Sequence, residues 1–263
     1  MSTTIPKGYA YDFTGSVVLV TGGGSGIGRQ IARDFAAAGA QVVVSGRTRS
    51  RLDETVAELG EGASARAVDI GDGAAVRALV EDVVREHGHL DVVVSNAADF
   101  IPGDITEVDD EAWERLRRTN VDGFFHLAKA ALPRLAERGG TFVATSSVSG
   151  LRGDWNQAVY NATKGAVSLF VQSLALDWGP RGVRVNAVAP SMTDTAPLAA
   201  VTSDPAALAR SEERVALGRI ADVTDIAPVV LFLASDAARY VNGVVLPVDG
   251  GTGASTGQAR PAA

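Results

Sequence analysis

The sequence predicts an α/β fold in which one doubly wound parallel sheet forms a single domain, and three observations lead to this prediction. Short segments rich in Val, Ile and Ala alternate with longer segments whose apolar residues recur every three or four positions, as expected of alternating strands and helices. The strand-like segments are almost continuously apolar, which is typical of parallel strands covered on both faces. A glycine-rich turn joins the first strand to the first helix.

The alternation extends along most of the 263 residues, a length that suits one large domain. Units of strand, helix and parallel strand connect by right-handed crossovers, and ligands of such sheets bind beyond the carboxyl ends of the strands. The predicted strands are 17–20, 41–45, a third that ends at residue 70, 90–95, 141–146 and 183–189, and the helices predicted after the glycine turn include 74–86, 107–137 and 157–178.

The glycine-rich turn, TGGGSGIG at residues 21–28, predicts a dinucleotide site of the Rossmann type. Gly22, Gly26 and Gly28 permit a tight turn, a close approach of the backbone to a pyrophosphate and close packing of helix on strand. The first N–H groups of the helix that follows point at the anion. A flexible loop has the same composition, but the strand before this turn and the helix after it are the context that a phosphate-binding turn requires.

The end of the second strand bears on the choice of cofactor. About twenty residues beyond the first glycine, an acidic residue holds the ribose 2′-hydroxyl in NAD-binding proteins. Here the chain has Ser45, Gly46 and Arg47 instead, which leaves room and a guanidinium for a 2′-phosphate. We therefore predict NADP(H) in preference to NAD(H), with a solvated loop position for Arg47 as the alternative.

Three further residues predict proton-transfer chemistry. Tyr160 and Lys164 are four positions apart in the predicted helix 157–178 and therefore share one face. A cation beside a phenol favours the phenolate, so this tyrosine is expected to exchange a proton with an alcohol or a carbonyl. Ser147 follows a predicted strand and offers a hydroxyl to the same substrate oxygen. The alternative is a tyrosine and a lysine that share a solvated helix face without a common role.

Composition excludes several other classes of function. The net charge of −7 disfavours nucleic acid as a partner, because such binding needs a concentrated basic surface. No Cys is present and only three scattered His occur, so we expect no metal site and no thiol nucleophile. The N-terminus has no signal-peptide core and no apolar run is long enough for a membrane span, so a cytoplasmic protein without membrane contact is expected.

Taken together, the motifs resemble those of the short-chain dehydrogenase/reductase family in its compact, single-domain form. The resemblance covers residues 13–251 and implies a Rossmann-type sheet of seven parallel strands, preceded by an N-terminal tail, 1–12, and followed by a flexible C-terminal tail, 252–263. The motifs that carry it are the glycine turn, Asp69, Asn96-Ala97-Ala98, Asn120, Ser147, Tyr160 with Lys164, Val185-Asn186-Ala187-Val188-Ala189-Pro190 and Val248-Asp249-Gly250-Gly251.

The resemblance also implies a role for individual residues. Tyr160 is expected to be the acid/base, Lys164 to lower its pKa and to hold the nicotinamide ribose, and Ser147 to steady the substrate oxygen. Asn120 is expected to hold a water in the proton path. Asp69 is expected to meet the adenine, Asn96 the adenosine side of the cofactor and Thr195 the nicotinamide carboxamide. The other residues expected to contact the cofactor are Gly22, Ser25, Gly26, Ile27, Gly28, Arg47, Ile70, Tyr160, Lys164 and Pro190.

Two positions depart from the family pattern. Ala98 stands where the third residue of Asn-Ala-Gly is a glycine, and Ser191 stands where a glycine follows Pro190. Each adds a side chain beside the expected cofactor, but neither change removes a reacting group.

The expected function is interconversion of a carbonyl and a secondary alcohol by hydride transfer, with Tyr160 as acid/base. An NAD-dependent sugar or polyol dehydrogenase, a 3-oxoacyl-thioester reductase of the same family and a non-catalytic dinucleotide-binding sensor are the alternatives. The connection 191–218 is expected to be a substrate lid. Because no basic patch is evident beside the lid, we expect a free small ketone, alcohol or sugar as substrate. The family resemblance further implies a homotetramer built through helices 107–137 and 157–178.

Overall fold

The computed structural model describes residues 11–256, and in them seven strands form one parallel sheet with the order β3-β2-β1-β4-β5-β6-β7. The chain starts in the middle of the sheet, moves outward to β3 and then returns to place β4 beside β1, so the order reverses there. The predicted doubly wound sheet is confirmed. The strands are β1 (Val17–Thr21), β2 (Gln41–Gly46), β3 (Ala63–Ala67), β4 (Val92–Ser95), β5 (Thr141–Thr145), β6 (Arg184–Pro190) and β7 (Val245–Val248).

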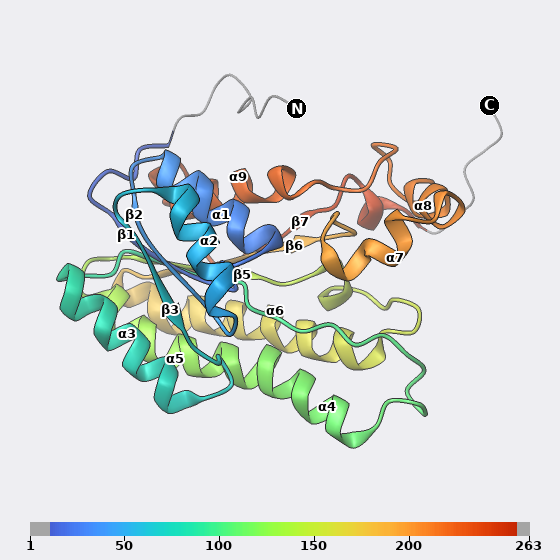
Figure 1. Ribbon diagram of the computed structural model, residues 1–263, viewed down its shortest axis with the longest axis horizontal. Coiled ribbons are helices and arrows are strands. Elements are labelled where there is room, and N and C mark those ends of the chain that lie inside the picture. Colours follow the sequence, from blue (N-terminus) through green and yellow to red (C-terminus); the bar gives the residue numbers. More distant parts are fainter. Residues whose placement is uncertain (1–10, 257–263) are drawn as a thin grey trace.

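Helices cover both faces of the sheet (Figure 1). On one face lie α3 (Gly73–His87), α5 (Gly123–Ala136) and α6 (Ala158–Trp178), and on the other lie α1 (Gly26–Ala37), α2 (Arg49–Leu59) and α9 (Val223–Ala234). The helix α4 (Asp110–Arg117) precedes α5. Between β6 and α9, α7 (Ala199–Thr202) and α8 (Pro205–Glu212) stand at one end of the sheet.

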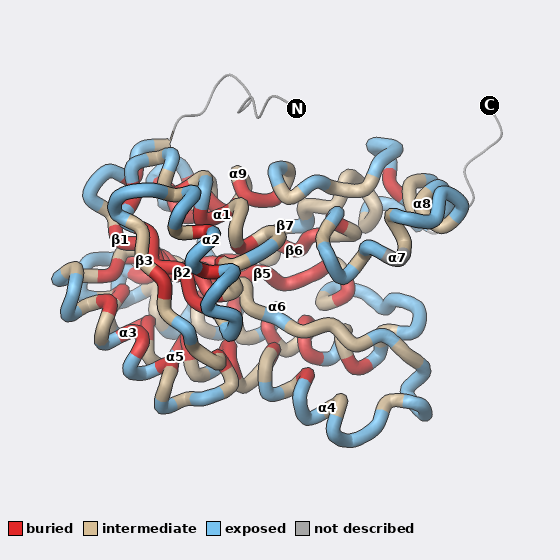
Figure 2. Tube along the Cα trace, viewed as in Figure 1, coloured by how far each residue is buried: buried red, intermediate tan, exposed pale blue. Residues whose placement is uncertain are grey.

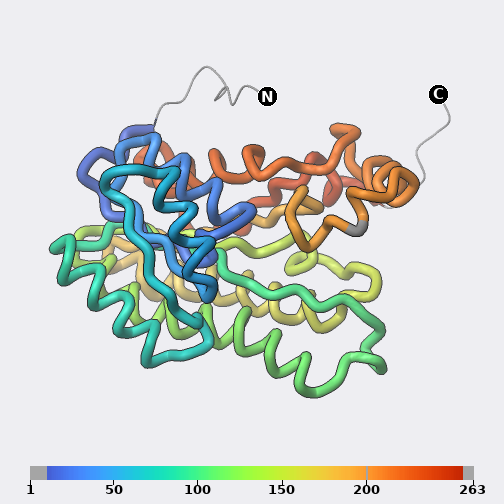
Figure 3. The backbone as a smooth tube through the Cα atoms, viewed as in Figure 1, coloured from blue at the N-terminus to red at the C-terminus, as the bar shows by residue number. Residues whose placement is uncertain are grey.

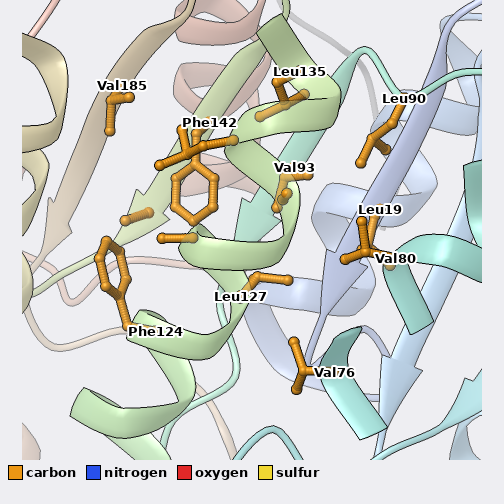
Figure 4. Packing of buried hydrophobic residues seen from close by; sticks show 14 of the residues in the cluster. Leu19, Val76, Val80, Leu90, Val93, Phe124, Leu127, Leu135, Phe142 and Val185 are labelled. Carbon is orange, nitrogen blue, oxygen red and sulfur yellow. The ribbon is translucent and has the colours of Figure 1, made fainter. Parts of the chain in front are cut away.

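Alternation along the strands divides the core into two clusters. Val17 and Leu19 of β1 pack with residues of α3, α5 and α6, whereas Val18 and Val20 pack with residues of α1 and α9. Figure 2 shows the strands as the most buried part of the chain, and Figure 4 shows how Leu19 lies beside Val80 of α3 in the first cluster. Full burial of one such side chain contributes about 1.5–3 kcal/mol.

Two predicted elements differ from the observed ones. The third strand ends at Ala67 instead of residue 70, because its partner strand β2 ends at Gly46, whose carbonyl oxygen accepts the Val68 N–H. The chain then turns, and the Asp69 carboxylate accepts the N–H of Gly71. The predicted helix 107–137 is α4 and α5 joined by a π-helical turn, η1 (Arg118–Asp122). Such turns often occur at functional sites.

Figure 3 follows the chain from β6 into the segment 191–218, which the sequence predicted to be a lid. Of the predicted C-terminal tail, Thr252–Ala254 form a short 3₁₀ helix, and residues 257–263 lie outside the described part, as do residues 1–10 of the N-terminal tail. Within residues 11–256 no helix has the length and apolarity to cross a membrane, and no cluster of acidic or His side chains is arranged to hold a metal.

Candidate active site

A cleft of about 1340 Å³ opens at the carboxyl ends of the parallel strands. Residues that follow four neighbouring strands line it: Gly22 after β1, Asn96 after β4, Ser147 after β5 and Ser191 after β6. The carboxyl ends of parallel strands share one edge of the sheet, so segments far apart in the sequence meet here.

The structure brings most of the predicted site residues into this cleft. Asn120 and Gly28 do not line it, although both are held close to residues that do. Those that line it are Gly22, Ser25, Gly26, Ile27, Arg47, Asp69, Ile70, Asn96, Ser147, Tyr160, Lys164, Pro190 and Thr195, together with Ala98 and Ser191.

The glycine turn leaves no space for larger residues. A Cβ at Gly28 would lie 2.4 Å from the Gly22 carbonyl oxygen, and one at Gly22 would lie 2.8 Å from the Asn96 amide nitrogen. Gly22 and Gly26 have φ values of 68° and 52°, which favour glycine. The Asn96 amide donates to the Thr21 carbonyl oxygen at 3.1 Å, so this side chain fixes the turn.

The N-terminus of α1 lies at the floor of the cleft and offers a site for an anion. Ser25 is the N-cap residue, and among the described residues its side chain makes no capping hydrogen bond to the helix. The first N–H groups of α1, at Gly26 and Ile27, therefore remain available as donors beside the positive end of the helix dipole. The glycine cradle and these donors fit the diphosphate of a dinucleotide.

One end of the cleft carries exposed guanidinium groups. Arg47 and Arg51 line it, and neither forms an ion pair within the described part of the chain. The Asp69 carboxylate, expected to meet an adenine, accepts a hydrogen bond of 3.0 Å from the guanidinium of Arg118. Because Arg51 lines this end of the cleft beside Arg47, the end carries more positive charge than the sequence prediction, which named Arg47 alone, suggested.

Ser147 and Tyr160 meet in the middle of the cleft. Ser147 lies two residues beyond β5, and a hydrogen bond between its side chain and Tyr160 opposes the rise of the tyrosine's pKa. Its hydroxyl also accepts the backbone N–H of Ser149 at 3.1 Å. The ring of Phe100 packs edge-on against Tyr160 with centroids 4.9 Å apart and restricts the orientation of the phenol.

Lys164 is buried on α6, and its Nζ donates to the Thr145 carbonyl oxygen at 2.8 Å. Nζ lies 5.8 Å from the centroid of the Tyr160 ring. Burial lowers the pKa of Lys164 to about 8 and raises the pKa of Tyr160 to about 12. For Tyr160, desolvation of the phenolate outweighs the hydrogen bond with Ser147, and the expected depression of this pKa by Lys164 stays a prediction.

Asn120 binds protein groups through its whole side chain. Its Oδ1 accepts the Asp99 N–H at 2.7 Å, and its Nδ2 donates to the Asp99 carbonyl oxygen and to the Thr163 hydroxyl, both at 3.0 Å. Thr163 in turn donates to the Tyr160 carbonyl oxygen at 2.8 Å. The π-helical turn thus ties the loop after β4 to the backbone of Tyr160. These contacts use the side-chain amide of Asn120, and its predicted role of holding a water stays a prediction.

Sequence reasoning missed three arginines. Arg152, in the loop before α6, lines the same cleft as Arg210 of α8 and Arg214 just beyond it, so the expectation of no basic patch beside the lid is wrong. In the sequence, Glu212 and Glu213 stand between Arg210 and Arg214 and offset their positive charge, so the net charge of this segment does not indicate a basic patch. The available signal was the spacing of four between residues 210 and 214, which places the two arginines on the same side of the lid.

A dinucleotide cradle joined to a serine, a tyrosine and a lysine at the end of a doubly wound sheet defines a class of enzyme, the dinucleotide-dependent oxidoreductases. A family model described as Enoyl-(Acyl carrier protein) reductase matches residues 22–253. The chain belongs to the short-chain dehydrogenase/reductase family, as its motifs suggested, and is an oxidoreductase of alcohol and carbonyl groups that uses a nicotinamide dinucleotide.

Several known proteins are similar over nearly their whole length. Meso-2,3-butanediol dehydrogenase of Serratia marcescens is 40% identical over 251 residues, which cover 94% of this chain and 98% of that enzyme. Galactitol 2-dehydrogenase (L-tagatose-forming) of Cereibacter sphaeroides is 37% identical over 241 residues, 90% of this chain and 94% of that one. The crystal structure of 3-ketoacyl-(acyl-carrier-protein) reductase from Brucella melitensis complexed with NADH has a TM-score of 0.87 at 32% identity and covers 92% of this chain and 100% of its own.

Proposed function

We propose that the protein interconverts a carbonyl and a secondary alcohol with NADP(H), and that Tyr160 exchanges the proton. One observation carries this proposal: Ser147, Tyr160 and Lys164 lie in the same cleft as the glycine turn. When bound, the nicotinamide dinucleotide supplies the hydride in reduction and accepts it in oxidation.

The protein groups supply the proton and the orientation. Because the pKa of Tyr160 is about 12, its hydroxyl is protonated at neutral pH and can donate a proton to a carbonyl oxygen during reduction. The Ser147 hydroxyl can donate a hydrogen bond to the same oxygen and hold it against Tyr160. Phe100 excludes water from one edge of the phenol. In the oxidative direction Tyr160 must first lose its proton, which burial makes difficult.

Lys164 has two expected tasks. Its protonated amine stabilises the negative charge that Tyr160 acquires as it donates its proton, and it is held in place by the Thr145 carbonyl oxygen. A pKa of about 8 keeps the amine mostly charged at pH 7. The same amine lies where it can hold a ribose hydroxyl, while Gly22, Gly26 and Ile27 would hold the diphosphate.

Replacement of Tyr160 by Phe tests this assignment. Positioned proton transfer is worth about 10² to 10⁴ in rate, so we expect Tyr160→Phe to lower kcat by at least 10² while the Kd for NADPH stays within a few fold. Phe keeps the ring that packs on Phe100 and removes only the hydroxyl. Near-normal turnover by this variant would reject Tyr160 as the acid/base.

Two observations support the preference for NADP(H). Arg47 and Arg51 line the cleft without ion-pair partners in the described part of the chain, and the second strand ends in Ser45 and Gly46 where NAD-binding proteins have an acidic residue. The Brucella melitensis reductase was crystallised with NADH, so NAD(H) is the second candidate. We expect Arg47→Ala to lower the ratio of kcat/KM for NADPH to that for NADH by about tenfold. Arg49→Ala is the matched control, because Arg49 is also exposed but pairs with Asp53 at 2.8 Å. A wild-type preference for NADH would reject the argument.

A diol, a polyol or a related hydroxyketone is one candidate substrate class, and a 3-oxoacyl thioester, as the name of the Brucella melitensis reductase suggests, is another. The two curated relatives described above are a butanediol dehydrogenase and a galactitol dehydrogenase. A panel of vicinal diols, polyols, their ketones and acetoacetyl-coenzyme A, followed by NADPH and NADH absorbance, separates these classes. Binding of the dinucleotide without turnover of any of them would favour a non-catalytic sensor.

A homotetramer and a cytoplasmic location remain proposals drawn from the family. The tetramer is supported by Phe125 on α5 and by Leu169 and Leu176 on α6, which are 44%, 65% and 78% exposed and are costly to leave in water. We expect Leu169→Asp to dissociate the oligomer in light-scattering measurements. Leu217→Asp is the control, since Leu217 is 72% exposed but lies on the lid segment. A wild-type monomer would overturn this proposal.

A further inference from the structure

The lid presents a basic face to the substrate end of the cleft. Residues 207, 210, 211 and 214 of the lid line the cleft, and their spacing of three and four places them on one side of α8 and of the turn that continues it. Such a stripe is usually apolar when it faces protein. Here it contains Arg210 and Arg214, four residues apart.

Arg210 lies in the last turn of α8 and Arg214 in the turn that follows it, so two like charges lie close together in the lid. Neither Arg210 nor Arg214 forms an ion pair among the residues that the structure describes. Glu212 and Glu213, which lie between them in sequence, do not line the cleft. Both guanidinium groups are exposed and unpaired in the described part of the chain, so they remain available to an anion in the cleft.

Arg152 adds a third positive charge from another wall of the same cleft. It lies in the loop that precedes α6, and its carbonyl oxygen accepts the side-chain amide of Asn161 at 3.1 Å, so the loop is tied to the helix that carries Tyr160. Figure 1 shows the lid helices and the start of α6 at the same end of the molecule. Positive charges from two separate segments thus line one cleft, and guanidinium groups bind carboxylates and phosphates well.

The nearby carboxylates already have partners. The Asp154 carboxylate accepts hydrogen bonds from the Ser149 hydroxyl at 3.3 Å and from the Trp155 N–H at 2.9 Å. Asp99 accepts the Arg115 guanidinium at 3.3 Å. Neither acid pairs with a lid arginine, so the substrate end of the cleft keeps an excess of free guanidinium groups.

From these observations we infer that the substrate carries an anionic group, a carboxylate or a phosphate, which Arg210, Arg214 and Arg152 bind while its carbonyl or alcohol lies at Tyr160. This inference rests on the proposed function, because it places the anion on the substrate of that same site. It narrows the substrate class from any small ketone or alcohol to an oxo acid, a hydroxy acid or a sugar phosphate.

Matched substrate pairs test the inference. Acetoacetate is compared with methyl acetoacetate, and dihydroxyacetone phosphate with dihydroxyacetone, each by NADPH oxidation at pH 7 and low ionic strength. In the wild type we expect kcat/KM for at least one anionic member to exceed that of its neutral partner by about 10- to 100-fold, mainly through KM. The pair that shows the preference distinguishes a carboxylate from a phosphate, and added salt should reduce it.

The variant R210A/R214A should bring that ratio down at least tenfold, and Arg152→Ala should lower it by less. Arg77→Ala is the charge control, because Arg77 is an exposed arginine of α3 that does not line the cleft. It should leave the ratio unchanged. Equal ratios in the wild type and in R210A/R214A, or a wild-type preference for both neutral substrates, would overturn the inference while leaving the proposed function intact.

Calorimetric titration keeps the two proposals separable. If no substrate is turned over, the proposed function fails, but the binding of acetoacetate and dihydroxyacetone phosphate to the whole chain with NADPH present can still be measured. A Kd that rises at least tenfold in R210A/R214A supports the anion site. Absence of binding by both anions, or equal affinity in the variant, rejects it.

Discussion

Replacement of Asn120 by Ala should destabilise the protein through loss of three buried hydrogen bonds. Asn120 is 3% exposed, and its amide bonds to the N–H and carbonyl oxygen of Asp99 and to the Thr163 hydroxyl at 2.7–3.0 Å. Each bond contributes about 1 kcal/mol net, so Asn120→Ala should lower the free energy of unfolding by about 3 kcal/mol. For a chain of this size that corresponds to about 6–12 °C in Tm.

The assay is urea unfolding at a fixed protein concentration, with Thr163→Val as the partner variant. Because the Asn120–Thr163 bond is lost in both single variants, the double variant should be less destabilised than their sum by about 1 kcal/mol. Gln30→Ala is the matched control, since its amide makes a single bond, to Asp34 at 2.7 Å, in a partly buried position on α1. A loss below about 1 kcal/mol in Asn120→Ala, or strict additivity with Thr163→Val, would refute the role assigned to Asn120.

Two other predictions concern pH and the glycine turn. Reductive kcat/KM should be constant below about pH 7 and fall as pH rises through about 8, because Lys164 then loses the charge that stabilises the Tyr160 phenolate. A reductive rate that rises from pH 7 to 9 would contradict this. Gly28→Ala should weaken NADPH binding at least tenfold and lower Tm, because the added Cβ would lie 2.4 Å from the Gly22 carbonyl oxygen. Gly153→Ala is the control and should change neither quantity, because a Cβ at Gly153 would meet no atom within 4 Å.

The order of strands and helices could be predicted because burial on both faces imposes a continuous apolar pattern on strands and a period of three to four on helices. The glycine turn could be located for a similar reason, since its chemistry is local and lies within residues 21–28. The π-helical turn at Arg118–Asp122 could not be predicted. It adds one residue to a helical turn without any change in composition.

The sequence alone determined which reactive groups the chain has and that the ends of its parallel strands would gather them. The tertiary structure determined the direction in which the pKa of each group shifts. Burial raises the pKa of Tyr160 and lowers that of Lys164, and desolvation depends on neighbours supplied by several strands and helices. The structure alone also placed Arg152 in one cleft with Arg210 and Arg214, because a charge count along the chain cannot show which side chains share a cavity.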